Sequence, residues 1–165
     1  MVENSRDSIL ERQRLKILLE LFNKHKKIVD ISIIVAISIV VFIKAFGNYD
    51  VTKYIDGGYY VLEVKTLINS GKLYYEAPPL FFIIASMFSM ITNLELGLRI
   101  ASAFIVSLQV PSFFISLYLV KGRKEAYFTL PFTIWNTVFY KMYGNLSKNL
   151  LGLVFIPIIL AVVWR

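Results

Sequence analysis

The residues of this chain that could do chemistry lie in two polar segments, residues 47–77 and 141–149, each placed between long apolar stretches. The charged residues of the first segment are Asp50, Lys53, Asp56, Glu63, Lys65, Lys72 and Glu76. A carboxylate held near low-dielectric lipid can have its pKa raised towards the working range of a base. The second segment has no carboxylate, but its Lys148 and Asn149 are suited to an anionic headgroup or pyrophosphate.

Asp56 stands directly before Gly57 and Gly58, which open an amphipathic stretch. Aspartate is one of the preferred residues at the N-cap of a helix, where its side chain accepts a backbone hydrogen bond. From the residues alone, Asp56 therefore either caps a helix that starts at Gly57 or supplies a carboxylate for chemistry. Both roles can hold together.

The sequence contains few residues that could bind a metal ion or form a disulfide. The chain has no cysteine, which excludes disulfides and thiolate metal sites, and its single histidine, His25, lies in a lysine-rich tail away from other ligand-type residues. We predict neither a metal nor a cofactor.

Composition places these residues in a membrane protein. Of the 165 residues, 57% are hydrophobic, and the mean hydropathy is +0.64. A soluble domain is usually about 45–50% apolar, and here the excess is gathered into long blocks. The net charge of +7 comes from 18 Lys+Arg against 11 Asp+Glu, and the cations flank the apolar blocks. These cations are typical of signals that set the orientation of a chain in the membrane and of contacts with anionic lipid. They do not indicate binding to nucleic acid.

The pattern of residues 1–27 predicts a basic, amphipathic cytoplasmic tail that lies on the membrane, because charges alternate with apolar residues and end in a lysine cluster. A cleaved signal peptide is disfavoured, since this charged run is too long and no small-residue cleavage site follows. Residues 28–46 then form a first predicted span, whose two charges, Asp30 and Lys44, lie near its ends.

Three further spans are predicted at 98–120, 126–140 and 150–164. The cations at 121–124 and those of the tail should both be cytoplasmic, so the number of crossings between them is even. Residues 47–97 then form one external loop, and the short apolar helix after Pro78–Pro79 is re-entrant or interfacial. The predicted fold is all-α: a polytopic transmembrane helix bundle, residues 28–165, with an external loop that contains juxtamembrane helices.

The order of motifs in the external loop resembles a known family. The sequence reads Asp56-Gly-Gly-Tyr-Tyr, then a short amphipathic helix, the turn Gly71-Lys-Leu-Tyr, and Tyr75-Glu-Ala-Pro-Pro-Leu leading into an apolar helix. With the acidic-then-arginine segment 94–100, this is similar to the first external loop of GT-C glycosyltransferases, over roughly residues 28–125. The branch that it resembles most contains the protein O-mannosyltransferases and the lipid A aminoarabinose transferases.

The resemblance implies transfer of a sugar from a polyprenyl-phosphate carrier to a protein, lipid or glycan acceptor on the external or lumenal face. It implies that Asp56 is the catalytic base and that Glu76, just before the prolines, approaches the active site. Related transferases often have a cation at the position of Ala77. Lys72 or Arg99 could replace it at the carrier phosphate, although Lys72 is equally a solvated loop lysine and Arg99 could pair with Glu95 or Glu63.

The second polar segment departs from the family pattern, because the acidic residue that the family often has there is missing, which disfavours a carboxylate metal site. Lys148 and Asn149 are instead predicted to bind substrate. The chain could be the N-terminal part of a longer enzyme, a small relative that works with a partner membrane subunit, or a relative that has lost catalysis. The alternatives to an enzyme are an accessory or scaffold subunit of a glycosylation or envelope assembly complex and, third, a transporter. The expected location is the plasma membrane, or the endoplasmic reticulum membrane in a eukaryote.

Overall fold

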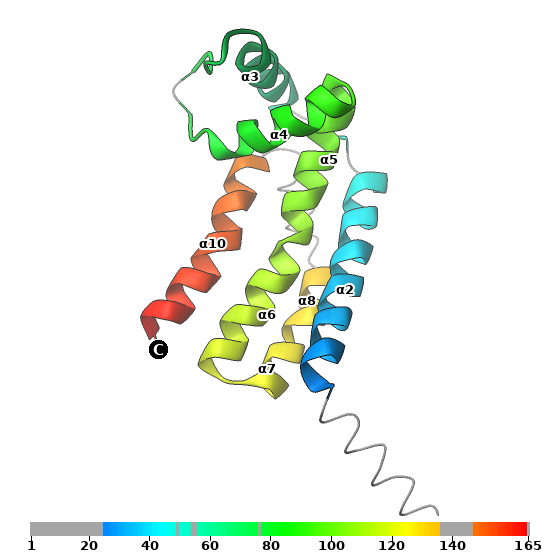
Figure 1. Ribbon diagram of the computed structural model, residues 1–165, viewed down its shortest axis with the longest axis vertical. Helices are drawn as coiled ribbons and strands as arrows, with labels where there is room; N and C mark the ends of the chain where they lie inside the picture. The colour runs from blue at the N-terminus through cyan, green and yellow to red at the C-terminus, as the bar shows by residue number, and fades with distance from the viewer. Residues whose placement is uncertain (1–24, 49, 54–55, 76, 136–146, 165) are drawn as a thin grey trace, which may run out of the picture. The chain divides into compact units, whose positions relative to one another are not determined.

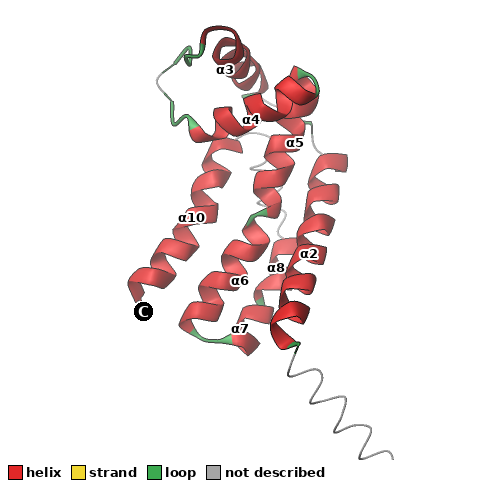
Figure 2. Ribbon diagram, in the orientation of Figure 1, coloured by secondary structure: helices red, strands yellow, loops and turns green. Residues whose placement is uncertain are grey.

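The computed structural model describes residues 25–48, 50–53, 56–75, 77–135 and 147–164. Every regular element in these ranges is a helix, and none of their residues belongs to a strand (Figure 2). The predicted all-α class is therefore confirmed for the described part of the chain. The chain divides into two units, residues 1–33 and 34–165, and the arrangement below concerns the second. The predicted amphipathic helix of the tail falls on residues 1–24, outside the described residues.

Helix α2, Lys26–Asn48, covers the first predicted span. Its 23 residues extend about 34 Å at 1.5 Å per residue, which exceeds the roughly 30 Å of a hydrocarbon core. Val41 and Ala45 are its buried residues, whereas most of its large apolar side chains are exposed. Near its end, the Lys44 ammonium donates to the backbone carbonyl of Ile134 (3.1 Å).

Helices α5, Leu94–Ser107, and α6, Gln109–Val120, follow one another almost without a break. Leu108 joins them, and its N–H donates to the Phe104 carbonyl (3.1 Å). The resulting 27-residue segment is about 40 Å long, starts before the predicted boundary at residue 98, and is the second helix long and apolar enough to cross a membrane. Its start is capped by Asn93, whose side chain accepts from the Leu96 N–H (2.9 Å).

Between these two long segments lie a short 3₁₀ turn, η1, at Val51–Lys53, and helices α3, Gly57–Ser70, and α4, Leu80–Ile91. Tyr60 of α3 is fully buried, and its ring centroid lies 5.2 Å from that of Phe81 and 6.1 Å from that of Phe82 on α4. With 12 residues, α4 extends about 18 Å and is too short to cross a bilayer by itself.

Helices α4 and α5 form a tight hairpin because Gly97 has no side chain. A β-carbon at position 97 would lie 2.4 Å from the backbone Cα of Ser89. The two helices therefore approach at backbone contact at this point, and the turn through Thr92 and Asn93 holds them together.

The chain continues through α7, Arg123–Tyr127, α8, Thr129–Trp135, and α10, Ser147–Trp164. The predicted span 126–140 is described only as far as residue 135, and α10 covers the predicted span 150–164. Helix α10 packs along α6 through two polar contacts: Gln109 donates to the Leu150 carbonyl (2.8 Å), and Ser112 donates to that of Val154. Helices α3 and α4 lie at the end of this unit where α5 and α10 begin, and α7 lies at the opposite end (Figure 1).

Candidate functional site

Asp56 precedes the first residue of α3, the helix that packs against α4 and α5. Its backbone has φ −85° and ψ 0°, a helical conformation, whereas a capping residue usually has extended backbone. Its side chain makes no capping hydrogen bond, and no hydrogen bond or ion pair joins its carboxylate to another of the described residues. The Asp56 side chain therefore does not cap α3, which was one of the two roles that the sequence left open for it. Asp56 as a residue is half-buried.

Tyr59, one turn into α3, connects Asp56 to the far end of the sequence. The ammonium of Lys148, at the start of α10, lies 4.8 Å from the centre of the Tyr59 ring, a cation–π contact. The same ring packs against Tyr75 (5.9 Å between centroids) and edge-on against Phe82 (5.7 Å). Lys148, predicted as a substrate-binding cation, is thus brought to the helix that begins beside Asp56.

Burial and charge also act on Tyr59. Burial raises the pKa of its phenol above the ordinary value, and the negative charges of Glu63 and Asp56 raise it further, because each disfavours a phenolate. The phenol of Tyr59 therefore stays neutral at physiological pH.

Glu63 holds the loop that leads to Pro78–Pro79, a role that sequence reasoning missed. Its carboxylate is fully buried and accepts from two consecutive backbone N–H groups, those of Tyr74 (2.8 Å) and Tyr75 (2.9 Å). The sequence carried one signal for this role. Glu63 occupies the same face of α3 as buried Tyr60 and Val64, at the spacing of an apolar helical stripe, and a charge there requires partners.

Arg99 joins α5 to the end of α2. Its guanidinium donates from Nε to the Phe46 carbonyl (2.7 Å), and a second N–H donates to the same oxygen. The Arg99 Cζ atom also lies 4.5 Å from the centre of the Phe46 ring. Of the two carboxylates that the sequence offered as partners, Glu63 is already engaged by backbone N–H groups. Phosphate binding by Arg99 stays a prediction.

Of the other predicted substrate-binding residues, one lies beside Lys148, one lies away from Asp56, and one is outside the described residues. Asn149 follows Lys148 in the first turn of α10 and is exposed. Lys72 is exposed beyond the C-terminal end of α3, so that it is separated from Asp56 by a helix of 14 residues, about 21 Å. The structure therefore does not bring Lys72 to Asp56. Glu76 lies outside the described residues.

Asp50 is the nearest other aspartate, and its environment differs. Its Oδ1 accepts from the Thr52 hydroxyl (2.7 Å) and the Thr52 N–H (3.2 Å), and its Oδ2 lies 3.3 Å from the Lys53 ammonium. The hydrogen bond from the Thr52 side chain, helped by Lys53, holds the pKa of Asp50 below its ordinary value. Asp50 is a structural carboxylate and a suitable control for Asp56.

At one end of the helical unit, the arrangement therefore offers aromatic rings, a lysine ammonium and a carboxylate that has no partner among the described residues. In the described residues no three histidine, cysteine, aspartate or glutamate side chains lie close enough together to hold a metal ion. Such a set can remove a proton from a nucleophile and neutralise an anionic group.

Comparisons with known proteins add no relationship: no family model matches the chain, and no curated protein or solved structure matches it significantly.

Proposed function

We propose that this chain is a multi-pass membrane glycosyltransferase of the GT-C type, or part of one, that uses a polyprenyl-phosphate sugar as its donor. The sugar passes to an acceptor on the external face of the plasma membrane, or on the lumenal face of the endoplasmic reticulum in a eukaryote. Motif order in the loop 47–97 supports the family, and the geometry around Asp56 supports the chemistry.

The proposed orientation follows from the Leu94–Val120 segment, which is about 40 Å long. The cations of the 121–124 stretch follow its end, whereas α3 packs near its start. Because cationic segments are retained in the cytoplasm, Asp56 and Lys148 belong to the external side. The short helix α4 then lies at the outer membrane surface, with an exposed apolar stripe formed by Leu80, Ile83, Met87, Met90 and Ile91.

The observation that carries the proposal is the contact of Lys148 with Tyr59, the third residue of the helix that Asp56 precedes. Asp56 and Lys148 are 92 positions apart in the sequence, yet the Lys148 ammonium lies 4.8 Å from the centre of a ring that follows Asp56 by three residues. A base and a cation on adjoining elements are what the transfer of a sugar from a phosphate requires.

The proposed step is a displacement at the anomeric carbon. Asp56 accepts the proton of the acceptor nucleophile, which forms a bond to that carbon while the bond from the carbon to the carrier phosphate oxygen breaks. The electron pair of the broken bond stays on the polyprenyl phosphate. Lys148 and Asn149 bind that phosphate and stabilise its additional negative charge.

Asp56→Asn tests the proposal, because it keeps the size of the side chain and removes the base. We expect transfer to fall roughly 100-fold or more while the protein inserts and accumulates normally. Transfer is measured in membranes that contain the longest native form of the chain. The donors are radiolabelled polyprenyl-phosphate sugars, mannose first and aminoarabinose second, and label is counted in protein and lipid acceptors.

Asp50→Asn is the matched control, since it removes an aspartate of the same segment whose carboxylate is already engaged by Thr52 and Lys53. We expect transfer by this variant within a few-fold of the parent. Near-normal transfer by Asp56→Asn would remove the catalytic assignment and leave an accessory subunit as the better account.

A further inference from the structure

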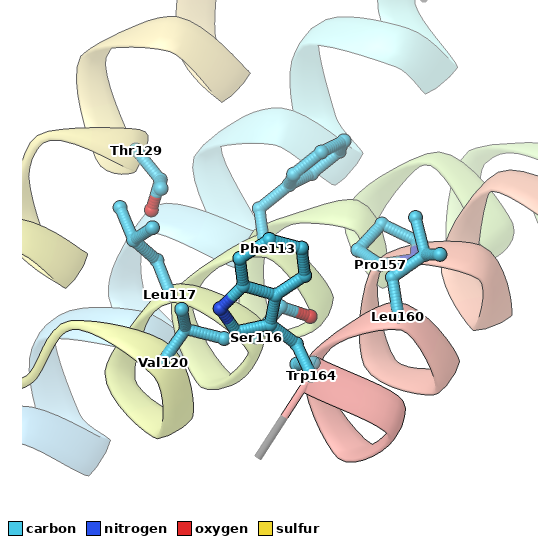
Figure 3. Close-up of a pocket in the computed structure, with 9 residues that line it drawn as sticks. Phe113, Ser116, Leu117, Val120, Thr129, Pro157, Leu160 and Trp164 are labelled. Carbon is cyan, nitrogen blue, oxygen red and sulfur yellow. The ribbon is translucent and has the colours of Figure 1, made fainter.

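An open pocket of about 310 Å³, called the cavity here, lies at the opposite end of the helical unit from Asp56. Helices α6, α8 and α10 form it, with Leu117 and Thr129 on one side and Pro157 and Leu160 on the other (Figure 3). Its volume is at the lower end of the range for ligand sites, about 300–1,000 Å³.

The wall of this cavity is almost wholly apolar, and its few hydroxyl groups are already used. The Ser116 hydroxyl donates to the Ser112 carbonyl (2.6 Å), and the Thr129 hydroxyl donates to the Ala126 carbonyl (2.7 Å). The cavity therefore offers its occupant mainly apolar contact surface, which suits a hydrocarbon chain.

A cluster of cations follows the cavity-lining end of α6 in the sequence. Val120 lines the cavity at the end of α6, and Lys121, Arg123 and Lys124 follow it directly. Gly122, with φ +108°, makes the turn between α6 and α7, and both Lys121 and Lys124 are exposed. Trp164, which also lines the cavity, is strongly exposed, and tryptophan prefers the depth of lipid headgroups.

We propose that this cavity binds one acyl chain of an anionic glycerophospholipid, whose headgroup is held by the cations that follow Val120. Charge complementarity selects an anionic lipid over a zwitterionic one, because three cations and an apolar cavity adjoin at the same end of α6. The inference requires the helices to lie in a bilayer, but it is independent of sugar transfer at Asp56.

Trp164 is the natural probe for this site. Replacing the other tryptophan, Trp135→Phe, leaves Trp164 as the single indole of the chain. The full chain is placed in vesicles that mix ordinary phosphatidylcholine with lipids whose acyl chains carry bromine, which quenches tryptophan on contact. Quenching by brominated phosphatidylglycerol and by brominated phosphatidylcholine, at equal mole fractions, gives the relative binding constant of the anionic lipid.

We expect a relative binding constant of about five or more in favour of phosphatidylglycerol. The triple variant K121Q/R123Q/K124Q should reduce it to about one. The control variant K24Q/K26Q/K27Q removes the same number of cations from the other basic cluster and should leave the preference in place. Equal quenching by both lipids in the parent, or loss of the preference only in the control variant, would overturn the proposal.

A second pair of variants tests the cavity itself. Ala161→Leu adds bulk to the buried cavity wall, whereas Val163→Leu adds bulk at an exposed position that does not line it. We expect the first change to remove the preference and the second to keep it, with helix content by circular dichroism equal in both. A preference unaffected by Ala161→Leu contradicts the site. Absence of quenching by either lipid would reject the membrane placement as well. Quenching that changes when the protein is diluted would show that a second copy of the chain, and not a lipid, occupies the cavity.

Discussion

At the scale of single residues, Glu63 shows how the candidate site is held. A buried carboxylate is costly unless it is hydrogen-bonded, and this one accepts two neighbouring backbone N–H groups in the loop after α3. The loop carries Tyr75, which packs on Tyr59, and Tyr59 in turn contacts Lys148. Glu63 is therefore a positioning residue, separate from the proposed base.

Glu63→Gln should release this loop. A glutamine can accept from one of the two N–H groups, but its own NH₂ group faces the other donor. We expect a loss of about 1–3 kcal/mol in the free energy of unfolding. Hydrogen exchange at the Tyr74 and Tyr75 amides should become markedly faster. Glu95→Gln, at an exposed position in the first turn of α5, is the control and should leave both amides protected. Unchanged exchange in Glu63→Gln would contradict the positioning role.

Sequence reasoning identified Asp56 and Lys148 as candidates but not the contact of Lys148 with Tyr59. A cation–π contact across 89 positions, from Tyr59 to Lys148, depends on how α10 packs, and nothing local in either segment encodes it. The same applies to Arg99, whose partner is a backbone carbonyl at Phe46. The charges in the sequence suggested carboxylate partners for Arg99. A free backbone carbonyl at a helix end is not associated with any residue type, so the sequence could not predict it as the acceptor.

At the scale of elements, apolar length predicted two of the four expected membrane-length helices. The first predicted span and α2 agree closely, and the segment after Asn93 is long enough to cross, as expected. The close approach of α4 to α5 could not be predicted from the sequence. A glycine within a helix can be present for several different structural reasons, and the sequence does not show which one applies. Here Gly97 is required by the backbone of Ser89.

Gly97→Ala should separate α4 from α5. Its β-carbon would lie 2.4 Å from backbone atoms of Ser89, which cannot move away as a flexible side chain can. We expect a loss of about 1–3 kcal/mol, the usual range for overpacking, measured by thermal unfolding in detergent.

Gly152→Ala is the matched control for this change. Gly152 lies within α10, and nothing is within 4 Å of the β-carbon it would gain. Alanine is the better helix former, so this variant should be neutral or slightly more stable. Equal effects of the two substitutions would contradict the close approach of α4 and α5.

At the scale of the whole molecule, the account places two kinds of chemistry at opposite ends of one membrane-length helical segment. The candidate site lies near the start of α5, and the cation cluster and apolar cavity lie near the end of α6. Hydropathy and the position of cations predicted only that the polar loop 47–97 and the 121–124 cations flank this segment. They were not enough to reveal the cavity, which depends on the packing of α6, α8 and α10.

The most direct test of the account is the side of the membrane on which each end lies. The chain has no native cysteine, so single cysteines can be introduced at exposed Lys72, Asn149 and Lys124 and treated with an impermeant maleimide. We predict that positions 72 and 149 are labelled in intact cells, and that position 124 is labelled only after the membrane is opened. Labelling of position 124 from outside, or of positions 72 and 149 from opposite sides, would contradict the account.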